Sequence, residues 1–548
     1  MSIFDTSQSI PVQKRNLFDL SRENIFTTEF GYITPIMCEP LFPGDSFRLR
    51  PSVLVKSAPM LAPIYGTINV DIHAFVVPLR LLWKEFDKWI YDQTNVNHVP
   101  PHVSKKTLIE ASRPTNLLNY LGIPQGKDIT SNKELNIFKI LGYLQIWKEY
   151  FRDEDLQTYP DFLDDNSIED YNTLYSQNTS EFTSFKKRCW RKDYFTSARP
   201  WPQKGTPPVL SLFQSQEIPV SFRTFIPQDA IGKRIYPTFL ASNSSAAFTY
   251  NNMSSQYGEV PQSYPSTPLI EGESGTINWF WDTSLAAGVD VAQLRTLFAV
   301  QKFLEKSAIV GSRYIEGNLA FFGTKIKDYR AQLPEFIGMT SQTLTIDEVV
   351  QNSETDKSLQ GHRTGQASTA FSGRTFKYFA SEFSLVYVLM SIRPRAVYFQ
   401  GLGKFWKQLD QFDFPFPDFQ SIGEQPISFD ELIVGDHVSD DDMDETFGYQ
   451  SRYAEIRSAF DEVHGNFVSN LNFWHLARMF DREHTSLNSR FITIEHYDQD
   501  FPENSLDRIF AVLETSPKDQ DHHFWCDAFI EWKVKRKFHY HTTPALIG

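Results

Sequence analysis

Two hydrophobic periods meet at one proline in the stretch from Thr67 to Asp92. Before the proline, apolar and polar residues alternate, which predicts a half-buried β-strand with Ile68, Val70, Ile72, Ala74 and Val76 on one side and Asn69, Asp71 and His73 on the other. We expect the strand to end at Pro78, because proline has no N–H to donate to a ladder. Beyond it, large apolar residues recur at steps of three and four, the pattern of one helix face: Leu79, Leu82, Trp83, Phe86, Trp89 and Ile90. The stretch therefore predicts a sheet strand that leads into a packed helix.

Other strands are predicted near both ends of the chain. Residues Gly31 to Val55 contain two short candidates separated by the turn Pro43-Gly44-Asp45, and the second keeps period two across Pro51, which indicates an edge strand or a bulge. Helical spacing dominates between the strands, as in Ile137 to Leu156. We expect five segments to share one antiparallel sandwich from which insertions extend: Ser46 to Val55, Thr67 to Val77, Thr375 to Ser391, Arg490 to His496 and Phe524 to His541.

Composition supports a mainly β fold of unusual size. The 548 residues exceed the roughly 250 to 300 that one core supports, so the chain must contain several domains or large insertions. The 47 Phe, 23 Tyr and 31 Pro favour strands and turns over a helical bundle.

Charge and cysteine content exclude several classes of protein. A net charge of -14 argues against a protein that coats nucleic acid with its whole surface, so any such contact must be local. Cys38, Cys189 and Cys526 are too few and too far apart for a disulfide framework, and we expect them to be buried small hydrophobes in a reducing compartment. The sequence shows no signal peptide and no apolar run of the ~20 residues that span a bilayer, so we predict a soluble protein without membrane insertion.

The candidate catalytic, cofactor and metal motifs are all incomplete. Gly401-Leu402-Gly403 begins like a dinucleotide loop, but Trp406 replaces the third glycine. Asp440, Asp442 and Asp444 have calcium-loop spacing without the required glycine and glutamate, so a solvated acidic loop is the better interpretation. His522, His523 and Cys526 lie on one short segment without obvious partners. We therefore predict no catalytic residue, no cofactor and no metal site.

Two basic segments are candidates for contact with nucleic acid. In Trp532 to His541, period two places Lys533, Lys535, Lys537, His539 and His541 on one side and Trp532, Val534, Arg536, Phe538 and Tyr540 on the other. We predict phosphate contact by Lys533, Lys535, Arg536, Lys537 and His539, with Phe538 or Tyr540 available for base stacking; the alternative is pairing with the acidic loop Asp436 to Glu445. The second segment has Lys186, Lys187, Arg188, Arg191 and Lys192 around Trp190 and Tyr194, for which an ordinary solvated face is the alternative.

Several runs, in order along the chain, resemble one family. The run DYFTSARPWPQKG at Asp193 to Gly205 is followed by LRTLFAVQKFLEK, SRYIEGNLAFFG, FGYQSRYAEIR and the terminal FWCDAFIEWKVKRKFHYHTTPALIG. Together with FVVPLRLLWKEF around Pro78, these resemble the major capsid proteins of microviruses, in particular the gokushovirus branch. Ser381 to Ser384 and Arg536 to His539 depart from the family's usual residues, which implies a distant branch.

This resemblance implies a structural protein and not an enzyme. Its expected fold is a viral jelly roll, an antiparallel β-sandwich with long, partly helical insertions. The family would assemble a small T=1 icosahedral shell around a circular single-stranded DNA genome, in the host cytoplasm, with the basic strand on the inner side of the shell. Implied partners are further copies of the chain, a small basic DNA-binding virion protein, a pilot or minor virion protein, and a host surface receptor.

The chain then divides into five expected parts. These are an N-terminal arm with the first jelly-roll strands (1–78), a helical and loop insertion (79–205), a variable surface insertion (206–288), a helix and loop insertion (289–365) and the remaining strands with the acidic loop and the basic strand (366–548). The resemblance implies that the 206–288 insertion forms a protrusion. We expect it to contact the receptor through Ser254, Tyr257 and Tyr264, because Ser, Asn and Tyr give an adaptable surface with few fixed charges; the alternative is a flexible spacer without a partner. The alternative function is a carbohydrate-binding or carbohydrate-cleaving β-sandwich, which the size of the purified particle would distinguish.

Overall fold

A computed structural model describes most of the chain: residues 15–91, 99–126, 133–164, 170–208, 291–352, 360–361, 363–434, 445–511, 522–538 and 540. The chain separates into two compact units, Met1–Lys204 with Leu304–Gly548, and Gly205–Phe303. The first unit contains both of the large sheets. No helix among the described residues is long and apolar enough to cross a membrane.

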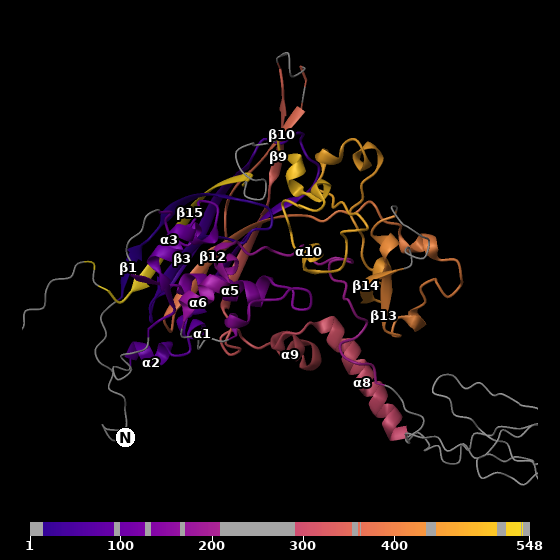
Figure 1. The fold of residues 1–548 in the computed structure, drawn as a ribbon, viewed down its shortest axis with the longest axis horizontal. Helices are drawn as coiled ribbons and strands as arrows, with labels where there is room; N and C mark the ends of the chain where they lie inside the picture. Colours follow the sequence, from indigo (N-terminus) through magenta and orange to yellow (C-terminus); the bar gives the residue numbers. More distant parts are fainter. Residues whose placement is uncertain are drawn as a thin grey trace, which may run out of the picture. The chain divides into compact units, whose positions relative to one another are not determined.

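Two antiparallel sheets form the centre of this unit (Figure 1). The larger sheet has seven strands: β1 (Asn16–Asp19), β2 (Arg22–Thr28), β4 (Ser46–Ser57), β9 (Thr345–Val350), β10 (Arg363–Ser372), β11 (Phe376–Phe379) and β15 (Phe524–Arg536). The smaller sheet has the order β3-β12-β5-β8, with β3 (Thr34–Leu41), β5 (Ile68–Pro78), β8 (Glu335–Thr343) and β12 (Ser384–Pro394). Two small pairs complete the strands: β6 (His102–Ser104) with β7 (Glu134–Asn136), and β13 (Glu424–Ser428) with β14 (Thr446–Ser451).

One hydrophobic core lies between the two large sheets. It contains Val53 and Val55 of β4, Ile530 and Val534 of β15, and the inward residues of β5 and β12. Successive strands change sheet repeatedly, from β3 to β4, from β4 to β5 and from β11 to β12. The predicted antiparallel β-sandwich is therefore confirmed for four of the five distant segments, with β5 and β15 on opposite sheets of one core.

The prediction that β5 is half-buried is wrong. Asp71 and His73 have only 1% and 7% of their surface exposed, because a layer of helices covers the second face of the smaller sheet. Phe75 and Val77 pack into that layer. Its helices, in chain order, are α1 (Leu79–Leu82), α2 (Phe86–Tyr91), α3 (Lys105–Ala111), α4 (Leu117–Tyr120), α5 (Phe138–Ile146), α6 (Tyr171–Gln177) and α7 (Thr179–Thr183).

Helix predictions are confirmed with shorter boundaries. The segment after Pro78 forms two short helices, α1 and α2, in place of one. The Ile137 to Leu156 segment is α5 followed by a π-helix, η1 (Trp147–Phe151). Three further helices are α8 (Val291–Val310), α9 (Tyr314–Phe322) and α10 (Ser489–Ile492).

Two strand predictions are corrected by the sheet pairing. Strand β4 is central and not at an edge, since β15 lies on one side and β10 and β11 on the other. Proline is tolerated at position 51 because β10 pairs with residues 52–56 and β11 with residues 46–49, so the ladder on that side is interrupted opposite Pro51. Arg490 to His496 is not a strand: the segment begins as α10, capped by the Asn488 side chain, and its Phe491 and Ile492 join another core.

Strands β9 and β10 also extend past the sandwich. The inner half of β10 pairs with β4, whereas its outer half pairs with β9 and, at Gly365, with the isolated bridge residue Met60, so the two strands continue as an arm (Figure 1). A separate core lies beside β13 and β14 and contains Phe195, Tyr398 and Phe447. Cys38 and Cys526 are buried as expected, and Cys189 is half-buried; all three are free thiols.

A candidate nucleic-acid interface on the open sheet face

The outer face of the larger sheet keeps half-buried and exposed residues along β4 and β15, and residues of α4 approach it beside Trp525. Along β15 the residues facing the core are buried and those between them, from Trp525 to Lys535, are half-buried or exposed. Strand β4 alternates in the same way, because Phe47 and Leu49 are buried while Arg48 and Arg50 are exposed. Residues paired directly across antiparallel strands point to the same face, so the outward residues of both strands form one surface.

The sheet register brings cations from three strands into neighbouring positions. Lys377 of β11 lies opposite Arg48 of β4, and Arg48 lies opposite Lys533 of β15. Arg50 and Lys535 occupy the next outward positions on their strands. We call these five residues the basic face: Arg48, Arg50, Lys377, Lys533 and Lys535. Asp19 and Glu531 are the acidic residues within the same rows.

Pairing of the strand lysines with the acidic loop of the same or a neighbouring subunit stays a prediction, because nearly all of that loop lies outside the described residues. Lys533 Nζ donates to Glu531 Oε1 at 2.9 Å, on the same strand. This hydrogen bond raises the pKa of Lys533 and lowers that of Glu531. Glu445, at the end of the loop, pairs instead with Arg482, and residues 435–444 lie outside the described part of the chain.

The other residues predicted to contact phosphate have different surroundings. Arg536 is directed to the other side, where its Nε donates to the buried Asp45 at 2.8 Å and its guanidinium lies 5.1 Å from the Phe42 ring. Lys537 lies against Gly44. His539 and His541 are outside the described residues. Arg536 therefore belongs to the packing of the sandwich, and we leave it out of the interface.

Aromatic side chains continue the same face toward the other end of β15. Trp525 and Phe529 are 44% and 49% exposed, and Trp525 borders a groove of about 610 Å³ that Ile25, Lys56 and Tyr120 also line. Exposed aromatic rings beside cations suit single-stranded nucleic acid, because bases stack on rings while phosphates pair with cations. The predicted stacking residues also make contacts within the chain, since Phe538 packs on Phe42 and Tyr540 donates to the Leu17 carbonyl, but both rings remain exposed.

The second basic segment is used inside the protein. Lys186 pairs with Glu181, Lys187 with Glu495, Arg188 with Asp71 and Lys192 with Asp153. Trp190 is buried and lies 5.0 Å from the Arg478 guanidinium. Three of these ion pairs reach other segments of the chain, whereas Lys186 pairs with a residue five positions before it. These contacts do not support nucleic-acid binding by the segment, and the alternative of a solvated face describes only Arg191 and Lys192, which are exposed.

The remaining candidate residues from the sequence are either placed in the structure or lie outside its described part. Gly401 allows a close backbone approach, because a Cβ there would clash with the Glu431 carbonyl oxygen. Ser254, Tyr257, Tyr264 and the three aspartates from 440 to 444 lie outside the described residues. His523 does have partners that the sequence did not indicate, since Glu29 and Asp507 lie beside it.

The outward positions of β4 offered a signal from which Arg48 and Arg50 could have been found. In the run SFRLRPS the two arginines alternate with Phe47 and Leu49, which is the pattern of a strand with one polar face. No sequence signal indicated that this strand lies next to β15.

Comparison with known proteins gives a consistent result over nearly the whole chain. Residues 7–546 match the family described as "Capsid protein (F protein)". The chain is 30% identical to "Capsid protein VP1" of Bdellovibrio phage phiMH2K over 94% of this chain and 92% of that protein. It is 28% identical to "Capsid protein VP1" of Chlamydia phage 1, over 97% and 96%, and 27% identical to "Capsid protein VP1" of Spiroplasma virus 4, over 84% and 85%.

Proposed function

Because the chain belongs to the phage capsid family described as "Capsid protein (F protein)", we propose that its copies enclose a single-stranded DNA genome and hold it on the basic face. The microvirus resemblance is confirmed by this membership, and the protein is a structural component of the virion that assembles with itself. The carbohydrate-binding alternative receives no support from the family.

The observation that carries the DNA proposal is the gathering of cations on an otherwise acidic molecule. The chain has a net charge of -14, yet the basic face has five cations against Asp19 and Glu531. Phosphate binding requires such clustered Lys and Arg, and it is independent of sequence. The outward residues from Trp525 to Lys535 extend over ~33 Å of strand, with the rings toward one end, Lys533 and Lys535 toward the other, and Asp527 and Glu531 between them.

Several finer assignments belong to the same proposal. The basic face would line the interior of a T=1 icosahedral shell assembled in the host cytoplasm around circular DNA. Because the chain as a whole is acidic, a separate small basic virion protein would neutralise most of the genome charge, and a pilot or minor virion protein would complete the particle. The five-part division of the chain and the receptor contact by residues 206–288 also stay predictions.

The test removes two cations that are not needed for packing. Replacing Lys533 and Lys535 by Gln should weaken binding of single-stranded DNA to purified chain or disrupted particles. The slope of log affinity against log salt should become less steep by up to about 0.7 for each phosphate that the variant no longer neutralises. The salt dependence can be measured by fluorescence anisotropy of a labelled oligonucleotide.

A matched control removes the same charge elsewhere. Lys84 and Lys106 are exposed and lie in the helical layer on the far side of the smaller sheet. The double variant Lys84→Gln with Lys106→Gln should leave the salt slope unchanged. Equal effects of the two double variants, or no effect of either, would show that DNA does not bind on the basic face.

A further inference from the structure

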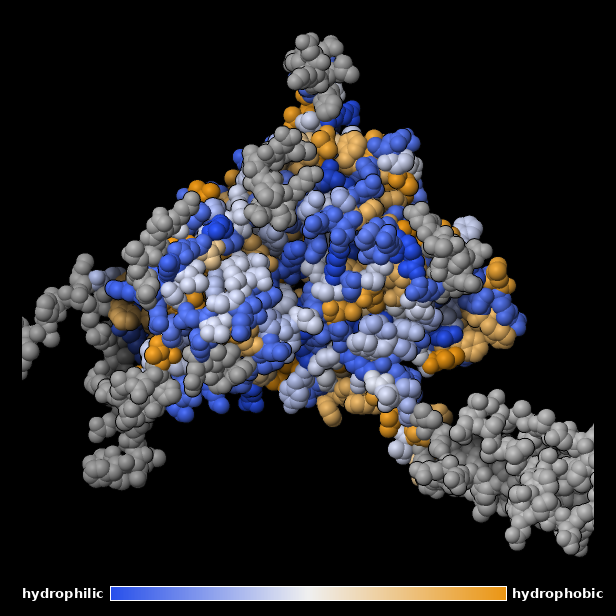
Figure 2. Space-filling view, viewed as in Figure 1, coloured by the Kyte–Doolittle hydropathy of each residue, from blue (hydrophilic) through white to orange (hydrophobic). Residues whose placement is uncertain are grey.

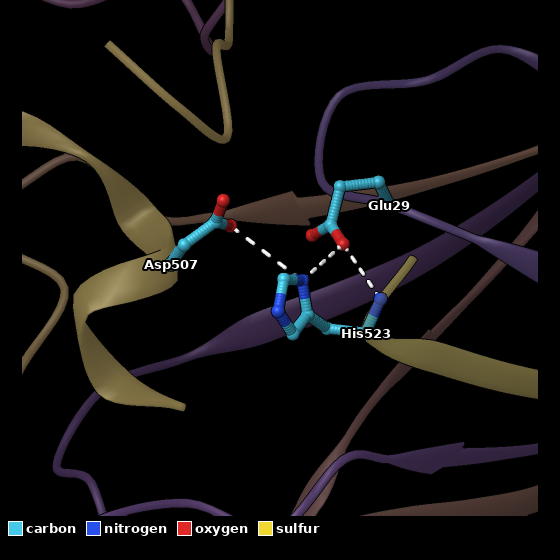
Figure 3. Close-up of side chains that lie close together, drawn as sticks. All are labelled: Glu29, Asp507 and His523. Atoms are coloured by element: carbon cyan, nitrogen blue, oxygen red, sulfur yellow. Dashed lines mark hydrogen bonds and ion pairs between the residues drawn. The ribbon is translucent and has the colours of Figure 1, made fainter. Parts of the chain in front are cut away.

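A buried histidine and two buried or half-buried carboxylates meet where three distant segments of the chain converge (Figure 3). Glu29 follows β2, Asp507 lies in the short helix η12 (Leu506–Ile509), and His523 immediately precedes β15. Glu29 is fully buried and His523 is 6% exposed. Each of the three side chains offers one possible ligand atom, and these three atoms all lie within 4.8 Å of one another.

The spacing of the ligand atoms is close to that of a tetrahedral metal site. His523 Nδ1 lies 2.7 Å from Glu29 Oε2 and 3.7 Å from Asp507 Oδ1. Ligands at 2.0–2.1 Å from a tetrahedral zinc ion are about 3.3 Å apart. Shifts of a few tenths of an ångström in these side chains would therefore admit an ion.

His496 provides a further nitrogen in the same buried region. It is 3% exposed, and neither ring nitrogen has a hydrogen-bond partner. Its carbonyl accepts the Asp507 backbone N–H at 3.1 Å, and the charge of Glu29 acts on its ring. The Tyr32 ring packs edge-on against the His496 ring, but both ring nitrogens are buried without a hydrogen-bond partner. Buried polar atoms in that state cost free energy, which a bound ion would recover.

Surrounding contacts fix the orientation of the ligands. Glu29 Oε1 accepts the backbone N–H of Phe30 at 2.8 Å, and Oε2 accepts the backbone N–H of His523 at 2.7 Å. The His523 ring stacks on Phe510 with ring centroids 4.4 Å apart. Such outer contacts hold metal ligands in place in known sites.

We propose that Glu29, Asp507 and His523 bind a zinc ion, and that the His496 side chain moves toward them to supply the fourth ligand. Imidazole ligands favour zinc over calcium, which takes oxygen ligands. The ion would tie the N-terminal strands to the C-terminal strand β15, a structural role that goes beyond enclosing DNA and does not depend on it.

The experiment uses full-length chain dialysed against EDTA and titrated with zinc chloride in a calorimeter. We expect one zinc ion per chain and a higher melting temperature with zinc. Asp507→Asn, which is nearly isosteric, and His496→Gln should each remove the stoichiometric binding and the zinc-dependent shift in melting temperature, with circular dichroism as the check on folding. Addition of cobalt to wild-type chain should give the intense visible absorption of a tetrahedral site.

Surface histidines supply the control. His464 and His484 are exposed and pair with Glu462 and Asp481. The variant with His464→Gln and His484→Gln should bind zinc as wild type does. The proposal is overturned if wild-type chain binds no stoichiometric zinc and gives only the weak cobalt spectrum of an octahedral aqua ion, if both site variants bind as tightly as wild type, or if binding disappears with the surface histidines.

Discussion

Asp71 is a carboxylate in the protein interior whose charge two arginines balance. Its side chain accepts hydrogen bonds from Arg188 at 2.7 Å, Arg393 at 2.9 Å and the Ser341 hydroxyl at 2.6 Å. Burial alone would raise the pKa of Asp71, but Arg188 and these hydrogen bonds outweigh it and hold the pKa below its ordinary value. His73, two residues along the same face of β5, lies in the field of both arginines; burial and Arg188 lower its pKa to about 3.

His73 should make the protein less stable in mild acid. Its pKa is lowered on folding, so between pH 6.5 and about 3 the unfolded chain binds a proton that the folded chain does not, and stability is lost as the pH falls. From pH 7 to pH 5 the contribution is about 2 kcal/mol. His73→Phe keeps a ring beside Phe75 and cannot titrate, so its melting temperature should fall less between pH 7 and pH 5 than that of wild type.

Asp71 affects stability in a different pH range from His73 and therefore serves as an internal control. A carboxylate with a lowered pKa contributes stability above its unfolded value of 3.8 and loses it only below that pH. An identical pH dependence of His73→Phe and wild type from pH 7 to 5 would contradict the assignment to His73.

Contact between one helix and one strand depends on a single glycine. Gly142 lies inside α5, where a Cβ would clash with the Tyr387 hydroxyl oxygen. Tyr387 belongs to β12, is fully buried and donates to the Lys139 carbonyl at 2.8 Å, which holds the helix on the smaller sheet. The close approach is thus possible only without a side chain at position 142.

Gly142→Ala should destabilise the protein even though alanine favours helix by about 1 kcal/mol. Overpacking costs typically 1–3 kcal/mol, so we expect a net loss of about 1 kcal/mol or more, measured as a lower midpoint of denaturant unfolding. Removing the hydroxyl should relieve part of the clash, so Gly142→Ala with Tyr387→Phe should be more stable than the sum of the two single changes predicts. Simple additivity would show that the two residues are not coupled.

A capsid protein needs surfaces that its own copies cover, and one segment of the first unit has the required character. Between Lys404 and Ile422, large apolar side chains are exposed, the most exposed being Leu409 at 92% and Trp406 at 75%: Phe405, Trp406, Leu409, Phe412, Phe414, Phe416 and Ile422. Figure 2 shows hydrophobic surface at the side of the molecule where β13 and β14 lie. The segment is held by Lys407, which pairs with the buried Asp430 at 2.8 Å. Patches of this kind mark protein contacts, and aromatic anchors dominate their energy.

We predict that this segment contacts a second copy in the shell. The double variant Trp406→Asp with Leu409→Asp should leave a folded chain that no longer forms particles. Every equivalent contact in the shell would bury less apolar surface, so the loss of binding free energy is repeated at each of them. Particle yield by sedimentation and folding by circular dichroism measure the two effects. Tyr91→Asp with Val99→Asp changes two other exposed apolar residues and should preserve assembly. Normal particles from the Trp406 and Leu409 variant would exclude the segment from the contact.

The sequence by itself determined the features that depend on near neighbours in the chain. Three of these features are present: the strand that ends at Pro78, the turn at Pro43-Gly44-Asp45, and the split of β15 into core-facing and outward residues. They follow from backbone geometry, which gives strands a period of two, and from proline, which ends a ladder. The family was also evident from runs of residues in order, as the match over residues 7–546 confirms.

Only the tertiary structure decided which of these elements share surroundings. Burial of both faces of β5, the central place of β4 and the internal pairing of Arg188 with Asp71 depend on segments more than a hundred residues apart. The basic face and the group of Glu29, Asp507 and His523 likewise combine residues from both ends of the chain. Side-chain periodicity states which way a residue points, whereas its partners are set by the packing of the whole core, which no local pattern encodes.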